Sequence, residues 1–203
     1  MLAHGSQAGA GRDGFGVDAQ FKQRLGPISP AGRVPVLVDD GFVVWDTLAI
    51  AEYLAEKFPD LKLWPGATRA RARARSVCAE MHAGFSSLRS ACGMNIEASL
   101  AAAGRLIWRD NAGVRADVAR LVEMWSELLT EHQGPMLFGR FSIADAYFAP
   151  VCMRLKTFAL PVPEHIAAYV ERVRDLPGVK AWIDAALAEK DFLNFEEPYR
   201  LKP

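Results

Sequence analysis

The chain has 203 residues, 51% of them hydrophobic and 24% charged, which is enough for a substantial core in one or two domains. Its 24 basic and 24 acidic residues balance, so charge gives no reason to expect nucleic acid or an anionic membrane as a partner. No apolar run reaches the roughly 18 residues that a transmembrane helix requires, and the N-terminus lacks the apolar core of a signal peptide.

Cysteine usage agrees with a cytoplasmic location. Cys78, Cys92 and Cys152 are an odd number of widely spaced cysteines, which argues against a disulfide framework. We expect three buried thiols in a reducing compartment.

Residues 1–19 are predicted to be a disordered leader, because five of the first sixteen residues are glycine and no apolar periodicity is present. The first structured domain is expected over residues 20–62. It begins with a possible short helix, Gln20 to Leu25, which Gly26 and Pro27 end.

A hairpin and a helix are predicted next. Val34 to Val38 is a short β-branched run, the turn residues Asp39 to Gly41 follow, and Phe42 to Val44 is a second strand. Apolar residues then recur at helical spacing between residues 48 and 58, and Pro59 ends that helix.

Residues 67–203 are predicted to form an all-helical domain, since no strand pattern appears after Thr68. The fold class is therefore α+β, with a small α/β piece followed by a helical bundle. The expected helices are Arg69 to Cys92, Val114 to His132, Ser142 to Phe158, Pro163 to Arg174 and Pro177 to Glu189.

The segment Arg33-Val34-Pro35 is the first candidate site. Proline has no amide donor, so Pro35 belongs at a strand start or on an edge. A bend there would turn the amide and carbonyl of Val34 outward, where they can pair with an extended peptide ligand. An ordinary strand start after a glycine-containing loop explains the same residues.

Asp46 and Thr47 are the second candidate site, because either can cap the helix that follows. Free amides and the positive end of the helix dipole gather there, so a carboxylate can dock with the Thr47 hydroxyl as a further donor. Asp46 would accept a hydrogen bond from an ammonium group. A plain N-cap is the alternative interpretation.

Ser142 and Asp145 form the Asp variant of a capping box, and here we favour a purely structural role worth about 1 kcal/mol or more to folding. The four histidines show no ligand spacing with cysteines or acids, so no metal site is expected. No phosphate loop, dinucleotide fingerprint or nucleophile elbow is present.

Three segments together resemble the glutathione S-transferase family, in particular bacterial members similar to the zeta class and to maleylacetoacetate isomerase. They are SPAGRVPVLVDDG, WDTLAIAEYLAEKFPD and FGRFSIADAYFAPV, in the family's order and spacing. The resemblance implies a thioredoxin-like N-terminal domain, an all-α C-terminal domain and a cytoplasmic homodimer. It implies glutathione as co-substrate, a small electrophile as second substrate and a role in glutathione metabolism.

The resemblance also assigns roles to the candidate residues. Pro35 would be the cis-proline, and the Val34 backbone would pair with the cysteinyl part of glutathione. Asp46 and Thr47 would hold the γ-glutamyl end, and Arg33 would reach the glycyl carboxylate. Ser142 and Asp145 match the capping box of the family.

One departure from the family pattern limits the functional prediction. The family opens with a strand, a helix and a strand that carry a Tyr, Ser or Cys for thiolate stabilisation. Here a short leader stands before Gln20, with Ser6 as its only hydroxyl residue. We therefore predict a truncated thioredoxin-like domain, no assigned catalytic residue and impaired conjugation or isomerisation.

Two other interpretations stay open. The chain is a non-catalytic interaction or dimerisation protein of the same fold, or Met1 is not the natural start.

Overall fold

The computed structural model describes residues 23, 25–29, 31–96, 98–189 and 199. The chain divides into two compact units, Met1–Lys62 (unit 1) and Leu63–Pro203 (unit 2). The predicted leader lies outside the described residues. Of the predicted helix at residues 20–25, only Gln23 and Leu25 are described, and both are helical.

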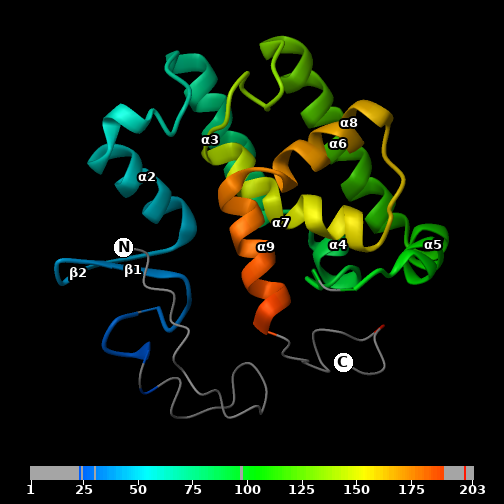
Figure 1. The fold of residues 1–203 in the computed structure, drawn as a ribbon, viewed down its shortest axis with the longest axis horizontal. Helices are drawn as coiled ribbons and strands as arrows, with labels where there is room; N and C mark the ends of the chain where they lie inside the picture. The colour runs from blue at the N-terminus through cyan, green and yellow to red at the C-terminus, as the bar shows by residue number, and fades with distance from the viewer. Residues whose placement is uncertain (1–22, 24, 30, 97, 190–198, 200–203) are drawn as a thin grey trace. The chain divides into compact units, whose positions relative to one another are not determined.

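Unit 1 contains the predicted hairpin. Strands β1 (Val36–Asp39) and β2 (Phe42–Trp45) pair antiparallel (Figure 1). Asp40 (φ 48°) and Gly41 (φ 83°) both adopt left-handed backbone, as a two-residue type I′ turn requires. This turn matches the right-handed twist of the strands, so its sequence determined the hairpin locally.

Helix α2 (Thr47–Lys57) follows the hairpin, and a single 3₁₀ turn, η1 (Pro59–Leu61), comes after it. The Tyr53 hydroxyl donates to Asp39 Oδ2 at 2.5 Å, and Lys57 Nζ pairs with the same oxygen. These two bonds lower the pKa of Asp39 and raise the pKa values of Lys57 and Tyr53. Asp39 thus ties the end of β1 to the last turns of α2.

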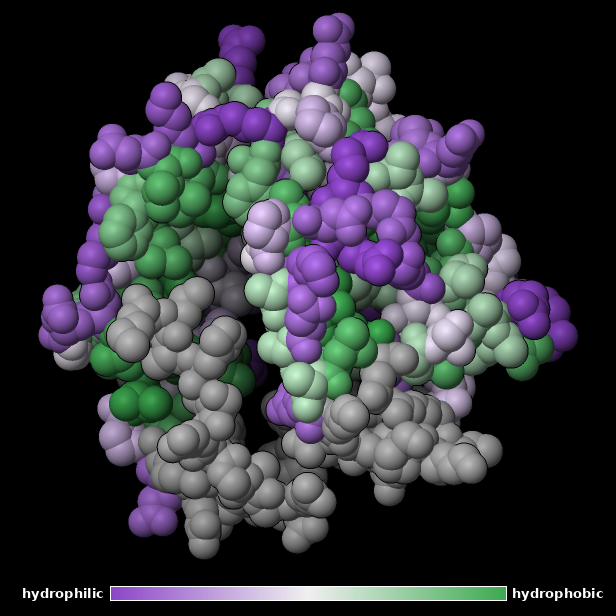
Figure 2. All heavy atoms as spheres, in the orientation of Figure 1, coloured by the Kyte–Doolittle hydropathy of each residue, from purple (hydrophilic) through white to green (hydrophobic). Residues whose placement is uncertain are grey.

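Several apolar side chains of unit 1 remain exposed: Val34 by 54%, Val38 by 43%, Phe42 by 61% and Trp45 by 42%. Figure 2 shows apolar residues in green at the surface over the hairpin and α2, at the left of the view. A two-stranded sheet with one covering helix cannot bury both of its faces.

The regular structure in the described part of unit 2 is helical, apart from isolated bridges at residues 136–140. Its described helices are α3 (Thr68–Ala83), α4 (Ser86–Ala91), α5 (Ala101–Asp110), α6 (Ala112–His132), α7 (Ile143–Thr157), α8 (Glu164–Arg174) and α9 (Pro177–Glu189).

The core of unit 2 lies around α7, which packs against α3 and α8 (Figure 1). Trp125 is fully buried, and its ring meets Phe148 edge-on at 5.2 Å and Tyr169 at 5.1 Å between centroids. These three aromatic rings join α6, α7 and α8 into one apolar centre.

The prediction of one long helix from Arg69 to Cys92 was wrong. Gly84 is extended (φ −108°, ψ −164°) and Phe85 is left-handed (φ 55°), so α3 ends and α4 begins anew. The amide of Leu88 donates to the Asp117 carboxylate of α6 at 2.9 Å. The apolar spacing continues across the break, which is why periodicity alone did not reveal it.

Helix α5 was not predicted. Its only buried position is Gly104, where an added Cβ would lie 1.7 Å from the carbonyl oxygen of Phe158. A helix that buries one glycine against another backbone carries little apolar signal in its sequence. Close backbone approach in the folded bundle holds it in place.

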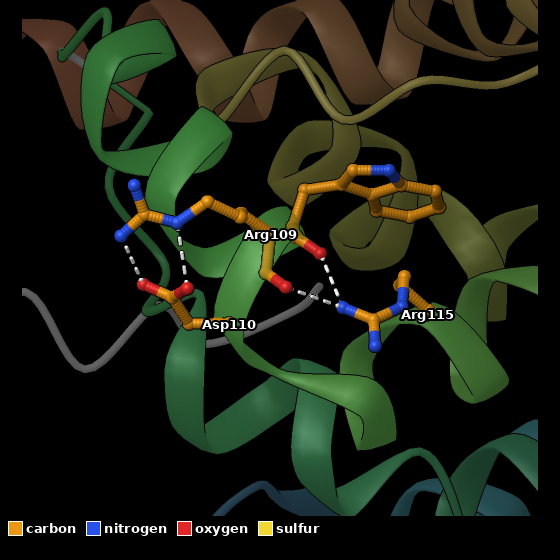
Figure 3. A network of polar contacts seen from close by, with 4 residues as sticks. Arg109, Asp110 and Arg115 are labelled. Atoms are coloured by element: carbon orange, nitrogen blue, oxygen red, sulfur yellow. Dashed lines mark hydrogen bonds and ion pairs between the residues drawn. The ribbon is translucent and has the colours of Figure 1, made fainter.

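A polar network joins α5 to α6 (Figure 3). Arg115 Nη1 donates to the carbonyl oxygens of Trp108 at 2.6 Å and Arg109 at 2.9 Å. The Arg109 guanidinium forms two hydrogen bonds with the Asp110 carboxylate. Arg115 therefore satisfies C-terminal carbonyls of α5 that have no partner within the helix.

The predicted capping box lies at the start of α7. Asp145 is fully buried, and its Oδ2 accepts a hydrogen bond from the Ser142 amide at 2.8 Å. Its Oδ1 accepts from the Leu137 amide and from the Tyr169 hydroxyl, both at 3.1 Å. Burial raises the pKa of Asp145, and these donors oppose that rise.

Candidate functional site

The candidate site lies at the open end of the hairpin. Val36 pairs with Trp45, and this is the last pair of the ladder on the side away from the turn. Pro35 comes just before Val36, and Asp46 comes just after Trp45. The register therefore places Pro35 beside the N-terminus of α2, although the two are eleven positions apart in the chain.

Val34 presents unpaired backbone at this end. The Val34–Pro35 peptide bond is cis, and β1 begins only at Val36. Among the described residues, neither the amide nor the carbonyl of Val34 has a hydrogen-bond partner. Arg33, Val34 and Pro35 are all exposed, so no side chain covers this short stretch.

The N-terminus of α2 supplies further donors. Asp46 Oδ1 accepts from the Leu48 amide at 2.8 Å, whereas the Thr47 and Ala49 amides have no partner among the described residues. Asp46 adopts φ 75° and ψ 133°, a conformation that costs a non-glycine residue free energy and is common at ligand sites.

The structure thus brings Val34, Pro35, Asp46 and Thr47 together at one end of the hairpin, with Arg33 next to them. An unpaired main-chain donor and acceptor can pair with an extended peptide. Free amides at a helix N-terminus favour a carboxylate. The arrangement suits a small peptide-like ligand with a carboxylate at one end.

Sequence reasoning missed Ser29. This residue is only 2% exposed, and its hydroxyl donates to the Arg33 carbonyl oxygen at 2.7 Å. In turn, Ser29 Oγ accepts a hydrogen bond from the Arg33 amide at 3.0 Å. The sequence around Ser29 does not indicate a role for this residue, so the sequence alone did not single it out.

The hydroxyls of Ser29 and Tyr53 are engaged in hydrogen bonds, and the three thiols of the chain are buried. Tyr53 is bonded to Asp39 at the turn end of the hairpin, and Ser29 is bonded to Arg33. The three cysteines are free, buried thiols of unit 2, as expected, and burial raises the pKa of Cys92 to about 11. Within the described part of unit 1, neither Tyr53 nor Ser29 is placed to stabilise a ligand thiolate.

The described residues form neither a candidate metal site nor a membrane-spanning helix. His, Cys, Asp and Glu side chains do not gather in groups of three suited to a metal ion. None of the described helices combines the length and apolar character needed to cross a membrane.

Comparison with known proteins identifies the family. The glutathione S-transferase N-terminal domain matches residues 16–57, and the C-terminal domain of the same family matches residues 58–185. The chain belongs to the glutathione S-transferase family. A thioredoxin-like N-terminal part followed by a mostly helical C-terminal domain confirms the predicted fold class.

Individual proteins similar to this chain support the same family assignment. A probable maleylacetoacetate isomerase of Caenorhabditis elegans is 30% identical over 166 residues, covering 78% of this chain and 73% of that protein. The glutathione S-transferase GstA of Escherichia coli O157:H7 is 29% identical, covering 80% and 76%. A crystal structure of a Burkholderia glutathione transferase homolog with bound glutathione superposes with a TM-score of 0.60 at 25% identity, covering 80% and 77%.

Proposed function

We propose that this glutathione S-transferase family member binds glutathione at the open end of its hairpin. The observation that carries the proposal is the register, which puts the unpaired Val34 backbone next to the free amides of α2. The glutathione bound in the Burkholderia homolog supports the choice of ligand.

Each residue of the candidate site is proposed to bind a different part of glutathione. The backbone of Val34, next to Pro35, pairs with the cysteinyl part as an added strand would. Thr47 and the α2 N-terminus hold the γ-glutamyl carboxylate, and Asp46 holds the ammonium group. Arg33 pairs with the glycyl carboxylate. Each charged group of the tripeptide then has a partner of complementary charge or dipole.

The reaction we propose is conjugation of glutathione to a small electrophile, or isomerisation of one, in a cytoplasmic homodimer. The similarity to a probable maleylacetoacetate isomerase favours isomerisation as one of the two. We propose that turnover is weak, because the hydroxyls of Ser29 and Tyr53 are already engaged. Weak turnover of an aryl halide, alongside measurable glutathione binding, is the expected result.

A non-catalytic interaction protein of the same fold is the second candidate. The engaged hydroxyls of Ser29 and Tyr53 favour it over an efficient enzyme. A stringent starvation protein A homolog of Pasteurella multocida, 25% identical over 162 residues, is also among the relatives. In this case glutathione has no role, so a binding measurement separates the two candidates.

The test is a calorimetric titration of the full chain with glutathione. Thr47→Ala is expected to weaken binding about tenfold, because it removes a donor to a charged group. Asp46→Asn should weaken binding as well, since asparagine keeps the cap and the positive φ but loses the charge. Thr68→Ala is the matched control, because Thr68 is also the first residue of a helix.

Two outcomes decide between the candidates. Unchanged affinity in Thr47→Ala and Asp46→Asn would show that glutathione binds elsewhere. No binding to the wild-type chain would refute the proposal and favour the interaction protein.

A further inference from the structure

Ser29 holds the loop that leads into the candidate site. Its buried hydroxyl is bonded to both backbone groups of Arg33, and the Gly32 amide donates to the Ser29 carbonyl oxygen at 2.9 Å. Gly32 takes a left-handed conformation (φ 61°), which lets the loop close within five residues. These hydrogen bonds, which we call the Ser29 clamp, fix the backbone of Arg33, one residue before Val34.

The clamp determines where the Val34 amide points. The Arg33–Val34 peptide bond is trans, since the cis bond of this segment is Val34–Pro35. In a planar trans peptide the carbonyl and the amide hydrogen point in opposite directions. Because the Arg33 carbonyl points at the buried hydroxyl of Ser29, the Val34 amide must point away from it.

We infer that Ser29 is a positioning residue for ligand binding, because it orients the Arg33–Val34 peptide so that the Val34 amide faces the ligand. This role rests on the proposed binding of glutathione at Val34. The serine touches no ligand itself; it acts through the backbone that does.

Removing the hydroxyl frees that peptide plane to rotate. The Arg33 carbonyl and amide then turn to solvent, and the Val34 amide loses its fixed direction. The donors at Thr47 on α2 do not depend on this loop, so their response to the ligand should persist. If the substitution instead destabilised unit 1 as a whole, ligand contacts at both Val34 and Thr47 would weaken.

The experiment compares Ser29→Thr with Ser29→Val, which have the same shape and differ in the hydroxyl. Glutathione affinity is measured by calorimetry, and the amide signals of Val34 and Thr47 are followed by ¹⁵N NMR during the titration. We expect Ser29→Val to bind about tenfold more weakly and Ser29→Thr to stay within about twofold of wild type. At saturation, Ser29→Val should keep the Thr47 shift and lose most of the Val34 shift.

Equal affinity of the two variants, or equal loss of the Val34 and Thr47 shifts, would overturn the positioning role and leave glutathione binding intact. If Ser29→Val fails to fold, a Ser29→Thr variant that binds tenfold more weakly than wild type overturns it too. A wild-type chain that does not bind glutathione refutes the proposed function, and this role falls with it.

Discussion

Replacing Asp145 by alanine should destabilise unit 2 strongly. The carboxylate is fully buried and accepts hydrogen bonds from the amides of Leu137 and Ser142 and from the Tyr169 hydroxyl. Alanine leaves all three donors buried without a partner. Each costs about 1–3 kcal/mol, so the expected loss in free energy of unfolding is about 3–9 kcal/mol. This is a large part of the 5–15 kcal/mol typical of a domain.

Urea unfolding followed by far-UV circular dichroism measures the loss. Asp184→Ala makes the same chemical change on the surface of α9, where Asp184 pairs with Lys180 at 3.0 Å. That exposed pair should contribute less than about 0.5 kcal/mol. Tyr169→Phe removes one donor together with its need for a partner, so it should cost less than Asp145→Ala.

A loss below about 1 kcal/mol in Asp145→Ala would refute this reasoning. It would mean that water or a shifted side chain satisfies the three donors.

Two further predictions follow from contacts in each unit. Gly104→Ala should lower the melting temperature of the chain, because its Cβ would lie 1.7 Å from the Phe158 carbonyl oxygen; Gly178→Ala, with open space around it, should not. Lys57→Met should raise the pKa of Asp39 back toward its ordinary value of 3.8, measured by carboxyl ¹³C NMR. Since the folded pKa is lowered, the stabilising contribution of Asp39 is complete above pH 3.8 and is lost as the pH falls through the folded pKa.

Each of these predictions has a clear contrary result. Equal melting temperatures for Gly104→Ala and Gly178→Ala would show that α5 is free to move away from Phe158. An unchanged pKa of Asp39 in Lys57→Met would mean that the Tyr53 hydroxyl alone accounts for the shift.

The hairpin, helix α2 and the α7 cap were predictable because their determinants are local. Asp40 and Gly41 specify the turn by backbone preference, and the strand register follows from that turn. Asp145 stands three residues after Ser142, so one short segment contains the whole capping box. The hydrogen bond from the Tyr169 hydroxyl to Asp145 was not predictable in this way, because Tyr169 lies 24 residues further along the chain.

The candidate site was predictable in its residue types and not in its geometry. The family-like segments identified Val34, Pro35, Asp46 and Thr47. Their meeting at one end of the hairpin depends on the register of the four residue pairs, which the turn sets. Ser29 escaped notice because its function depends on a buried hydroxyl and a closed loop, and neither leaves a distinctive pattern.

The sequence by itself determined which family this chain belongs to, where its hairpin turns and which helix start carries a capping box. Only the tertiary structure decided that Gly84 and Phe85 interrupt a helix, that α5 exists, and which way the Val34 amide faces. The reason is physical. Turns and caps are satisfied by neighbours a few residues away, whereas the break at Phe85 and the packing of Gly104 depend on partners from distant helices.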